Sequence, residues 1–177
     1  NFKHLRDGML NGNDFQRITQ TAGKLHKAPL FIDDTPGLSI LQLRAKARRM
    51  RSQHGVKLIV IDYLQLLHST SRRASDNRQQ EVAEISSGIK SLAKELSVPV
   101  IVLCQLNREM EREKNRKPRL SDLRESGSIE QDADLVGLLY KAYSEDEDGA
   151  LQDEDGIPIN LLLAKQRNGP TGDVPMV

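Results

Sequence analysis

The sequence KLIVIDYLQLL at residues 57–67 decides the fold. Its apolar side chains fall on both alternating faces, a pattern typical of a parallel strand that helices cover on both sides. Residues 100–106 (VIVLCQL) repeat the pattern. Between the two runs, Val82, Ile85 and Ile89 recur at steps of three and four, which predicts a helix. Strand, helix and strand in this order predict a right-handed crossover between parallel neighbours.

The segment before this unit predicts a helix, a strand and a second helix. A capping pattern at Asn13 begins the first helix, and Pro29 ends it. Residues 30–34 (LFIDD) are a short apolar run closed by a turn, which is typical of a strand. Ser39 and Gln42 then form the capping pair of the second helix.

The segment after the unit predicts a loop and two further strands. Residues 107–119 are too polar to pack and predict an exposed loop. Residues 133–140 and 157–164 are strand candidates, separated by an acidic surface excursion at residues 144–156. The alternation of helices and strands predicts the α/β class, with a mostly parallel sheet and helices on both faces.

Composition limits the class of protein. A chain of 177 residues with 37% hydrophobic content can bury one ordinary core. Its net charge of +1 argues against wholesale binding of a polyanion but allows a local basic groove. The single cysteine, Cys104, cannot form an intrachain disulfide, and no apolar run is long enough to span a bilayer. We expect a cytoplasmic protein with no membrane partner.

Polar residues lie at the ends of three of the predicted strands. Asp62, Gln105 and Lys165 fall at carboxyl ends, where α/β sheets bind ligands. From the residues alone, Asp62 is a metal partner or a turn cap. Gln105 is a donor to phosphate or a strand-end amide bonded to backbone. Lys165 and Arg167 share one face of a strand, and they either reach a polyphosphate or form a solvated basic end.

Four segments together resemble the RecA-like motor of DnaB-type replicative helicases: LIVIDYLQLL (58–67), VIVLCQLNR (100–108), RLSDLRESGSIEQDADL (119–135) and AKQRNGPTG (164–172). The similarity extends from Leu30 to Val174. It implies that residues 1–177 are a partial RecA-like helicase motor domain, incomplete at its N-terminal side. Residues 1–29 are then a helical lead-in, and residues 30–177 run from the Walker B element to the arginine finger.

The resemblance implies a site for ATP and Mg²⁺. Asp62 matches the Walker B carboxylate, which holds the hydrated magnesium. Gln105 matches the residue that senses the γ-phosphate. Lys165 and Arg167 match the finger that one subunit inserts into the nucleotide site of its neighbour. Because such a finger acts on a neighbouring subunit, the match of Lys165 and Arg167 implies a homo-oligomer, which in this family is a hexameric ring.

The same resemblance implies a loop that grips single-stranded DNA, formed by Arg124, Glu125, Ser126 and Gly127. Arg124 can pair with phosphate, and Gly127 lets the backbone approach the strand closely. Read without the resemblance, this is a loop capped into a helix, with Arg124 and Glu125 paired to each other. The basic residues of the preceding loop alternate with glutamates, which favours a solvated surface.

The function implied is ATP-dependent unwinding of duplex DNA at the replication fork, with primase and a helicase loader as further partners. No G-x-x-x-x-G-K-[ST] phosphate loop occurs in the sequence. The family carries that loop upstream of the region matching Asn1, so we expect this chain alone to bind ATP poorly and not to hydrolyse it. The alternative is a noncatalytic RecA-like module that binds DNA or a helicase ring without hydrolysing ATP.

Overall fold

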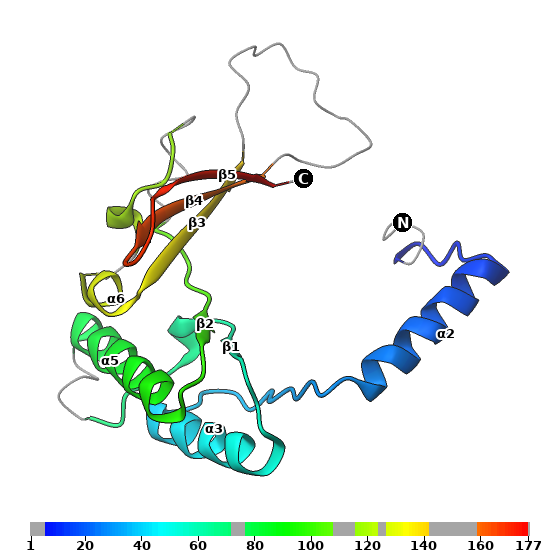
Figure 1. The fold of residues 1–177 in the computed structure, drawn as a ribbon, viewed down its shortest axis with the longest axis horizontal. Helices are drawn as coiled ribbons and strands as arrows, with labels where there is room; N and C mark the ends of the chain where they lie inside the picture. Colours follow the sequence, from blue (N-terminus) through cyan, green and yellow to red (C-terminus); the bar gives the residue numbers. More distant parts are fainter. Residues whose placement is uncertain (1–5, 72–76, 108–115, 124–126, 142–158, 177) are drawn as a thin grey trace. The chain divides into compact units, whose positions relative to one another are not determined.

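The computed structural model describes residues 6–71, 77–107, 116–123, 127–141 and 159–176 (Figure 1). The chain divides into two compact units, Asn1–Thr35 and Pro36–Val177. No described helix is long and apolar enough to cross a membrane.

The first unit contains one described amphipathic helix, α2 (Gly12–Lys27). Asn11 caps it: the Asp14 amide donates to the Asn11 side chain at 2.9 Å, and the Asp14 carboxylate accepts from the Asn11 amide at 3.1 Å. The helix predicted here is confirmed, with its start before Asn13. None of its residues is buried, and Phe15 and Leu25 are exposed.

The strand predicted at residues 30–34 is wrong, because these residues have no regular secondary structure and are exposed. The carboxylate of Asp33 accepts hydrogen bonds from the amide and the hydroxyl of Thr35, at 3.1 and 2.6 Å. An apolar run becomes a strand only when a partner strand binds its backbone, and no described strand of this unit does so.

The second unit contains the predicted parallel strands with a connecting helix. β1 (Ile59–Ile61) and β2 (Val100–Val102) pair in parallel, and α5 (Arg78–Leu96) connects them. β1 is shorter than the predicted strand at residues 57–67, because Leu64–Leu66 form a short 3₁₀ helix, η1. The chain turns there so that Leu64 and Leu67 both enter the core rather than alternating between two faces.

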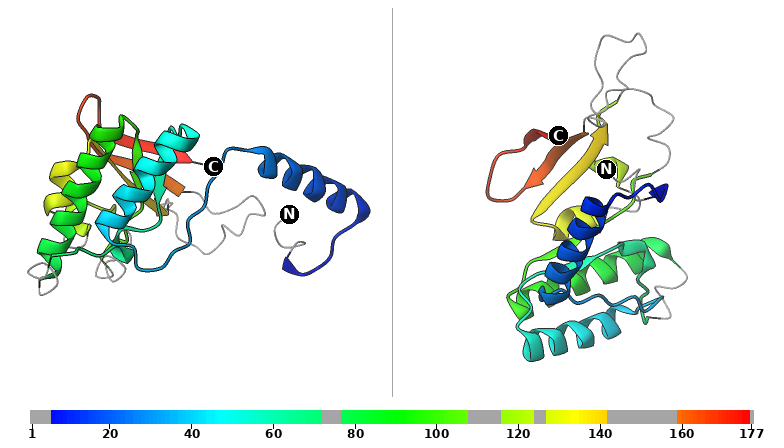
Figure 2. Two further views of the ribbon diagram at one scale, coloured as in Figure 1. Left: turned by 90° about the horizontal axis from the view of Figure 1, so that it is seen from below. Right: turned by 90° about the vertical axis from the view of Figure 1, so that its right-hand side faces the viewer.

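Two helices cover one face of this small sheet. α3 (Ile40–His54) starts at the predicted capping pair, in which the Gln42 amide donates to the Ser39 hydroxyl at 3.2 Å. It runs beside α5 (Figure 2), and both pack on a core of buried apolar side chains. The members of this core are Ile40, Ile61, Leu64, Leu67, Val82, Ile85 and Ile89.

The opposite face of β1 and β2 is apolar and exposed. Its side chains are Leu58, Val60, Ile101 and Leu103, which are 46–57% exposed. Within the second unit, α3 and α5 therefore cover one face of this sheet, although the apolar run of residues 57–67 predicts cover on both.

β3 (Leu135–Lys141), β4 (Ile159–Gln166) and β5 (Gly172–Met176) form a second sheet in that order. Both pairings are antiparallel, so the prediction of parallel pairing is wrong for these strands. β4 and β5 pair antiparallel because only a short turn connects them, whereas parallel strands need a longer crossover connection such as a helix. The α/β class is confirmed, because α5 connects the parallel strands β1 and β2 and helices and strands alternate along the second unit.

Candidate functional site

Asp62 and Gln105 lie at the same edge of the parallel sheet. Asp62 directly follows β1, and Gln105 comes shortly after β2. The two strands end in register, with Ile61 opposite Val102, so their carboxyl ends meet at one edge. The pairing continues one step further, since the Leu103 amide donates to the Ile61 carbonyl at 2.9 Å. The structure thus brings two of the predicted site residues together.

Gln65, which the sequence analysis did not single out, holds the backbone beside Gln105. Its side-chain amide group donates to the Cys104 sulfur at 3.1 Å and to the Gln105 carbonyl at 3.5 Å. Its side-chain oxygen accepts from the Gln105 amide at 3.5 Å. In the hydrogen bonds of the described residues, Gln105 uses only main-chain atoms, and the residue is exposed. Its side-chain amide is therefore available to a ligand.

The donor set at this edge fits magnesium that arrives with a nucleotide. Asp62 is exposed, and its carboxylate has no hydrogen bond or ion pair with any other described residue. No group of three or more His, Cys, Asp or Glu in the described part of the chain could hold a metal ion. Mg²⁺ typically uses one or two carboxylates and completes its octahedron with water and phosphate oxygens. A single exposed carboxylate is therefore sufficient here.

Lys165 and Arg167 both bind the end of α6 (Gly127–Asp132). The Lys165 ammonium donates to the carbonyl of Glu130 and, at 3.4 Å, to that of Gln131. The Arg167 guanidinium donates to the Gln131 carbonyl at 3.5 Å. The last carbonyls of a helix lack intrahelical donors and carry partial negative charge, so two cations stabilise this end. The two predicted finger residues thus converge on one group of acceptors in their own chain.

Asp134 connects Arg167 to a third cation. The Asp134 carboxylate pairs with the Arg167 guanidinium at 3.1 Å and also accepts from the Lys90 ammonium. The Asp134 carbonyl accepts from the Arg167 amide at 2.8 Å. The hydrogen bond from Lys90 lowers the pKa of Asp134, and burial opposes this, while the charges of Arg167 and Lys165 add to it. Sequence reasoning missed Asp134, although it lies in the RLSDLRESGSIEQDADL string.

The predicted DNA-binding loop is described at its two ends. Arg124, Glu125 and Ser126 lie outside the described residues, and Gly127 begins α6. On the other side, Leu123 is buried and pairs with Leu106 in an antiparallel bridge. Leu106 directly follows Gln105, so the strand end that carries the predicted phosphate sensor is paired with the start of the predicted DNA-binding loop.

A partly buried ion pair closes the base of the preceding loop. Arg116 makes two hydrogen bonds to the Asp122 carboxylate, at 2.8 and 2.9 Å. They lower the pKa of Asp122, against the effect of its burial. Lys117 pairs with Asp173 on β5 at 2.6 Å. Two basic residues of the loop at residues 107–119 are therefore neutralised by carboxylates of their own chain, which favours a structural role for them.

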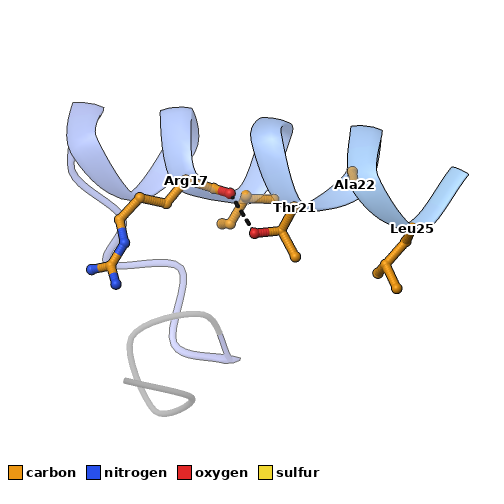
Figure 3. A pocket seen from close by; sticks show the side chains of 5 residues that line it. Arg17, Thr21, Ala22 and Leu25 are labelled. Carbon is orange, nitrogen blue, oxygen red and sulfur yellow. Dashed lines mark hydrogen bonds between the residues drawn. The ribbon is translucent and has the colours of Figure 1, made fainter. Parts of the chain in front are cut away.

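A shallow depression elsewhere, on α2, does not form part of this site (Figure 3). It is lined by Arg17, Ile18, Thr21, Ala22 and Leu25, all from that one helix. The Thr21 hydroxyl donates to the Arg17 carbonyl at 2.8 Å, so it is already engaged. None of the residues with a predicted role lines the depression.

The fold places the chain in the RecA-like class, and Asp62 and Gln105 follow its two parallel strands. The whole chain, residues 1–177, matches the family described as DnaB-like helicase C terminal domain, and the chain belongs to that family.

Relatives and solved structures support this family. The chain is 47% identical over 176 residues to the replicative DNA helicase DnaC of Bacillus subtilis and, equally, to the replicative DNA helicase DnaB of Geobacillus stearothermophilus. In each case 99% of this chain is covered, and the chain spans 38% of the relative's length.

Two solved structures have a closely similar fold. One, described as an ATPase domain, is 35% identical with a TM-score of 0.82, over 98% of this chain and 60% of that one. The other is a DnaB-like replicative helicase, described with its interactions with primase. It is 34% identical with a TM-score of 0.80, over 94% of this chain and 39% of that one.

Proposed function

We propose that the chain is part of the ATP-driven motor of a hexameric replicative helicase, which unwinds duplex DNA at the replication fork. Membership of the DnaB-like family supports the helicase activity. The observation that carries the proposal is the edge shared by Asp62 and Gln105, together with the pairing of Leu106 and Leu123. This arrangement connects a candidate nucleotide site to a candidate DNA-binding loop.

At the nucleotide site, Asp62 would hold a magnesium ion that arrives with ATP, and Gln105 would donate a neutral hydrogen bond to a phosphoryl oxygen. Mg²⁺, when bound with ATP, neutralises negative charge on the β- and γ-phosphates. The chain contains no phosphate loop of its own, so residues 1–177 alone bind ATP weakly.

Gln105 transmits the state of the nucleotide to the DNA-binding loop. Because Leu106 and Leu123 pair directly, a shift of the Gln105 backbone displaces the residue that precedes Arg124. Gln65 contacts both main-chain groups of Gln105, each at 3.5 Å, and so connects η1 to this segment.

Lys165 and Arg167 act in trans on the nucleotide of a neighbouring subunit. Both extend from the end of β4, where their cationic groups lie at the end of α6. Inserted beside a transferring phosphoryl group, they stabilise the charge that develops on it. Activity therefore requires an oligomer, and we propose a hexameric ring.

Arg124, Glu125, Ser126 and Gly127 bind single-stranded DNA through its phosphates, which makes binding insensitive to sequence and sensitive to salt. Aromatic residues make up 3% of the sequence, so base stacking contributes little. A solved relative is described with primase interactions, and we propose primase and a helicase loader as partners of this chain in the cytoplasm.

The test is the variant Arg167→Ala in the complete gene product. We expect ssDNA-stimulated ATP hydrolysis to fall on the order of a thousandfold, with ATP binding retained. Arg48→Ala is the matched control, because it also removes an exposed arginine from an ion pair, here with Glu95 on α5. Unchanged hydrolysis in Arg167→Ala would overturn the finger assignment. A folded oligomer that binds DNA without any hydrolysis would instead be a noncatalytic module.

A further inference from the structure

Asp134 lies between two cations that come from different elements. It occupies the connection between α6 and β3, Lys90 belongs to α5, and Arg167 directly follows β4. One carboxylate oxygen pairs with the Arg167 guanidinium at 3.1 Å, and the other accepts from the Lys90 ammonium. Lys90 is mostly covered, with a side chain that is 22% exposed, so it holds Asp134 from the protein side.

The Arg167 side chain is held by contacts within its own chain and is also partly exposed to solvent. Its guanidinium has five N–H donors, and the contacts to Asp134 and Gln131 use one terminal nitrogen each. The main chain of Arg167 is fixed too, because its amide donates to the Asp134 carbonyl at 2.8 Å. The side chain remains 52% exposed. The contacts to Asp134 and Gln131 therefore orient the guanidinium, and its remaining N–H donors stay free for a ligand.

We propose that Asp134 is a positioning residue for the arginine finger: the carboxylate, held by Lys90, directs the Arg167 guanidinium toward the nucleotide of the neighbouring subunit. This inference rests on the proposed function, and it assigns a role to a residue outside the predicted nucleotide and DNA sites. The Asp134 side chain is 60% exposed, and exposed ion pairs add little to stability. Its contribution is therefore to orientation, which matters because a small misplacement of a catalytic group slows a reaction strongly.

The experiment uses Asp134→Asn in the complete gene product, which preserves the shape of the side chain and removes its charge. We expect kcat for ssDNA-stimulated ATP hydrolysis to fall roughly tenfold to a hundredfold, while KM for ATP changes by less than about twofold. A purely structural role would lower the fraction of active protein and would also lower the melting temperature. Circular dichroism melts on the same preparation distinguish the two effects.

The deciding measurement is the double variant Asp134→Asn with Arg167→Ala. If Asp134 acts only through Arg167, the added substitution changes the residual kcat of Arg167→Ala by less than about twofold. The matched control is Glu95→Gln, another exposed carboxylate on which two cations converge, Arg44 and Arg48. We expect its ATPase activity to equal that of the unmodified protein.

Each outcome has a distinct meaning. Normal kcat in Asp134→Asn, with Arg167→Ala inactive, would overturn the positioning role and leave the finger intact. An equal further loss in the Arg167→Ala background would also overturn it, because Asp134 would then act by another route. Normal hydrolysis in Arg167→Ala would instead overturn the finger assignment itself, while the motor function would stand. No hydrolysis in the folded, unmodified complete protein would overturn the motor function. If Asp134→Asn does not fold, Lys90→Met removes the cation that holds the Asp134 carboxylate. A normal kcat in Lys90→Met would contradict the proposal.

Discussion

At the scale of single residues, the atoms that are already engaged decide what each side chain can do. Among the described residues Gln105 bonds through its main chain, to Gln65, so its side-chain amide is open to the phosphate that we propose as its ligand. Arg167 bonds to its own chain with two nitrogens and keeps further donors. Asp62 is exposed directly after β1, which leaves its carboxylate accessible to the magnesium that we propose for it.

Gly127→Ala tests the proposed approach of DNA to the loop. A Cβ atom at this position would meet nothing within 4 Å, so the fold should tolerate it. If a DNA backbone passes close to Gly127, we expect affinity for single-stranded DNA to fall roughly threefold to thirtyfold at constant salt, measured by fluorescence anisotropy on the complete gene product. Gly12→Ala on α2, where the space is equally open, is the control and should bind normally. Equal affinity in both variants would contradict a close approach.

Glu95 gives a prediction for pH. Hydrogen bonds from Arg48 and then Arg44 lower its pKa to about 2. Because the folded pKa lies below the ordinary value of about 4.3, the stabilisation is complete above that value and is lost as pH falls toward 2. We expect Glu95→Gln to lower Tm by less than about 4 °C at pH 7, and the difference to shrink below about pH 4. A difference that stays constant down to about pH 3 would contradict this account.

At the scale of elements, α3 and α5 are held together by a close approach at Gly88. A Cβ atom there would lie 2.6 Å from Cγ1 of Ile40, a side chain in the core. This contact sets how the start of α3 packs on the middle of α5. It also shows why a glycine is kept inside a helix, where it costs stability by itself.

Gly88→Ala is therefore expected to destabilise the fold by about 1–3 kcal/mol, because the Ile40 side chain must move in a packed core. Urea unfolding followed by circular dichroism measures the loss. Gly23→Ala is the matched control: it also lies inside a helix, α2, but nothing is within 4 Å of its new Cβ. We expect the control to be neutral or stabilising by up to about 1 kcal/mol. Equal stability of the two variants would contradict the packing argument.

Most elements could be predicted from the sequence, and the errors have a common cause. The helix start at Ser39 and Gln42 was correct because the capping interaction spans only three residues. The cap predicted at Asn13 was two residues late, since Asn11 caps α2. The strand predicted at residues 30–34 and the length of that at residues 57–67 were wrong, because strands depend on distant partners. The antiparallel order of β3, β4 and β5 likewise depends on the connections between them, which periodicity does not report.

The sequence proposed residues for the candidate site but not their contacts. The family resemblance indicated Asp62, Gln105, Lys165 and Arg167; the structure places the first pair at one sheet edge and the second pair in contact with the end of α6. It did not indicate Gln65 or Asp134, whose roles depend on neighbours that are distant in sequence. Such residues become visible only when the hydrogen bonds are known.

At the scale of the whole molecule, the proposal makes this chain one part of a nucleotide-driven motor. The exposed sheet face of the second unit, formed by Leu58, Val60, Ile101 and Leu103, is the kind of apolar surface that helices cover in parallel sheets. The chain spans 38% of the replicative helicases that it matches, and it contains no phosphate loop. Its activity should therefore depend on the segment that precedes the matching region in such relatives.

The most direct test measures ATP hydrolysis by residues 1–177 alone and by the same chain fused to the preceding segment of the Geobacillus stearothermophilus helicase, each with and without single-stranded DNA. The account predicts that the chain alone is silent, that the fused chain hydrolyses ATP, and that DNA raises its rate. Silence of a fused chain that is folded, oligomeric and bound to DNA would contradict the motor assignment and identify a noncatalytic binding module.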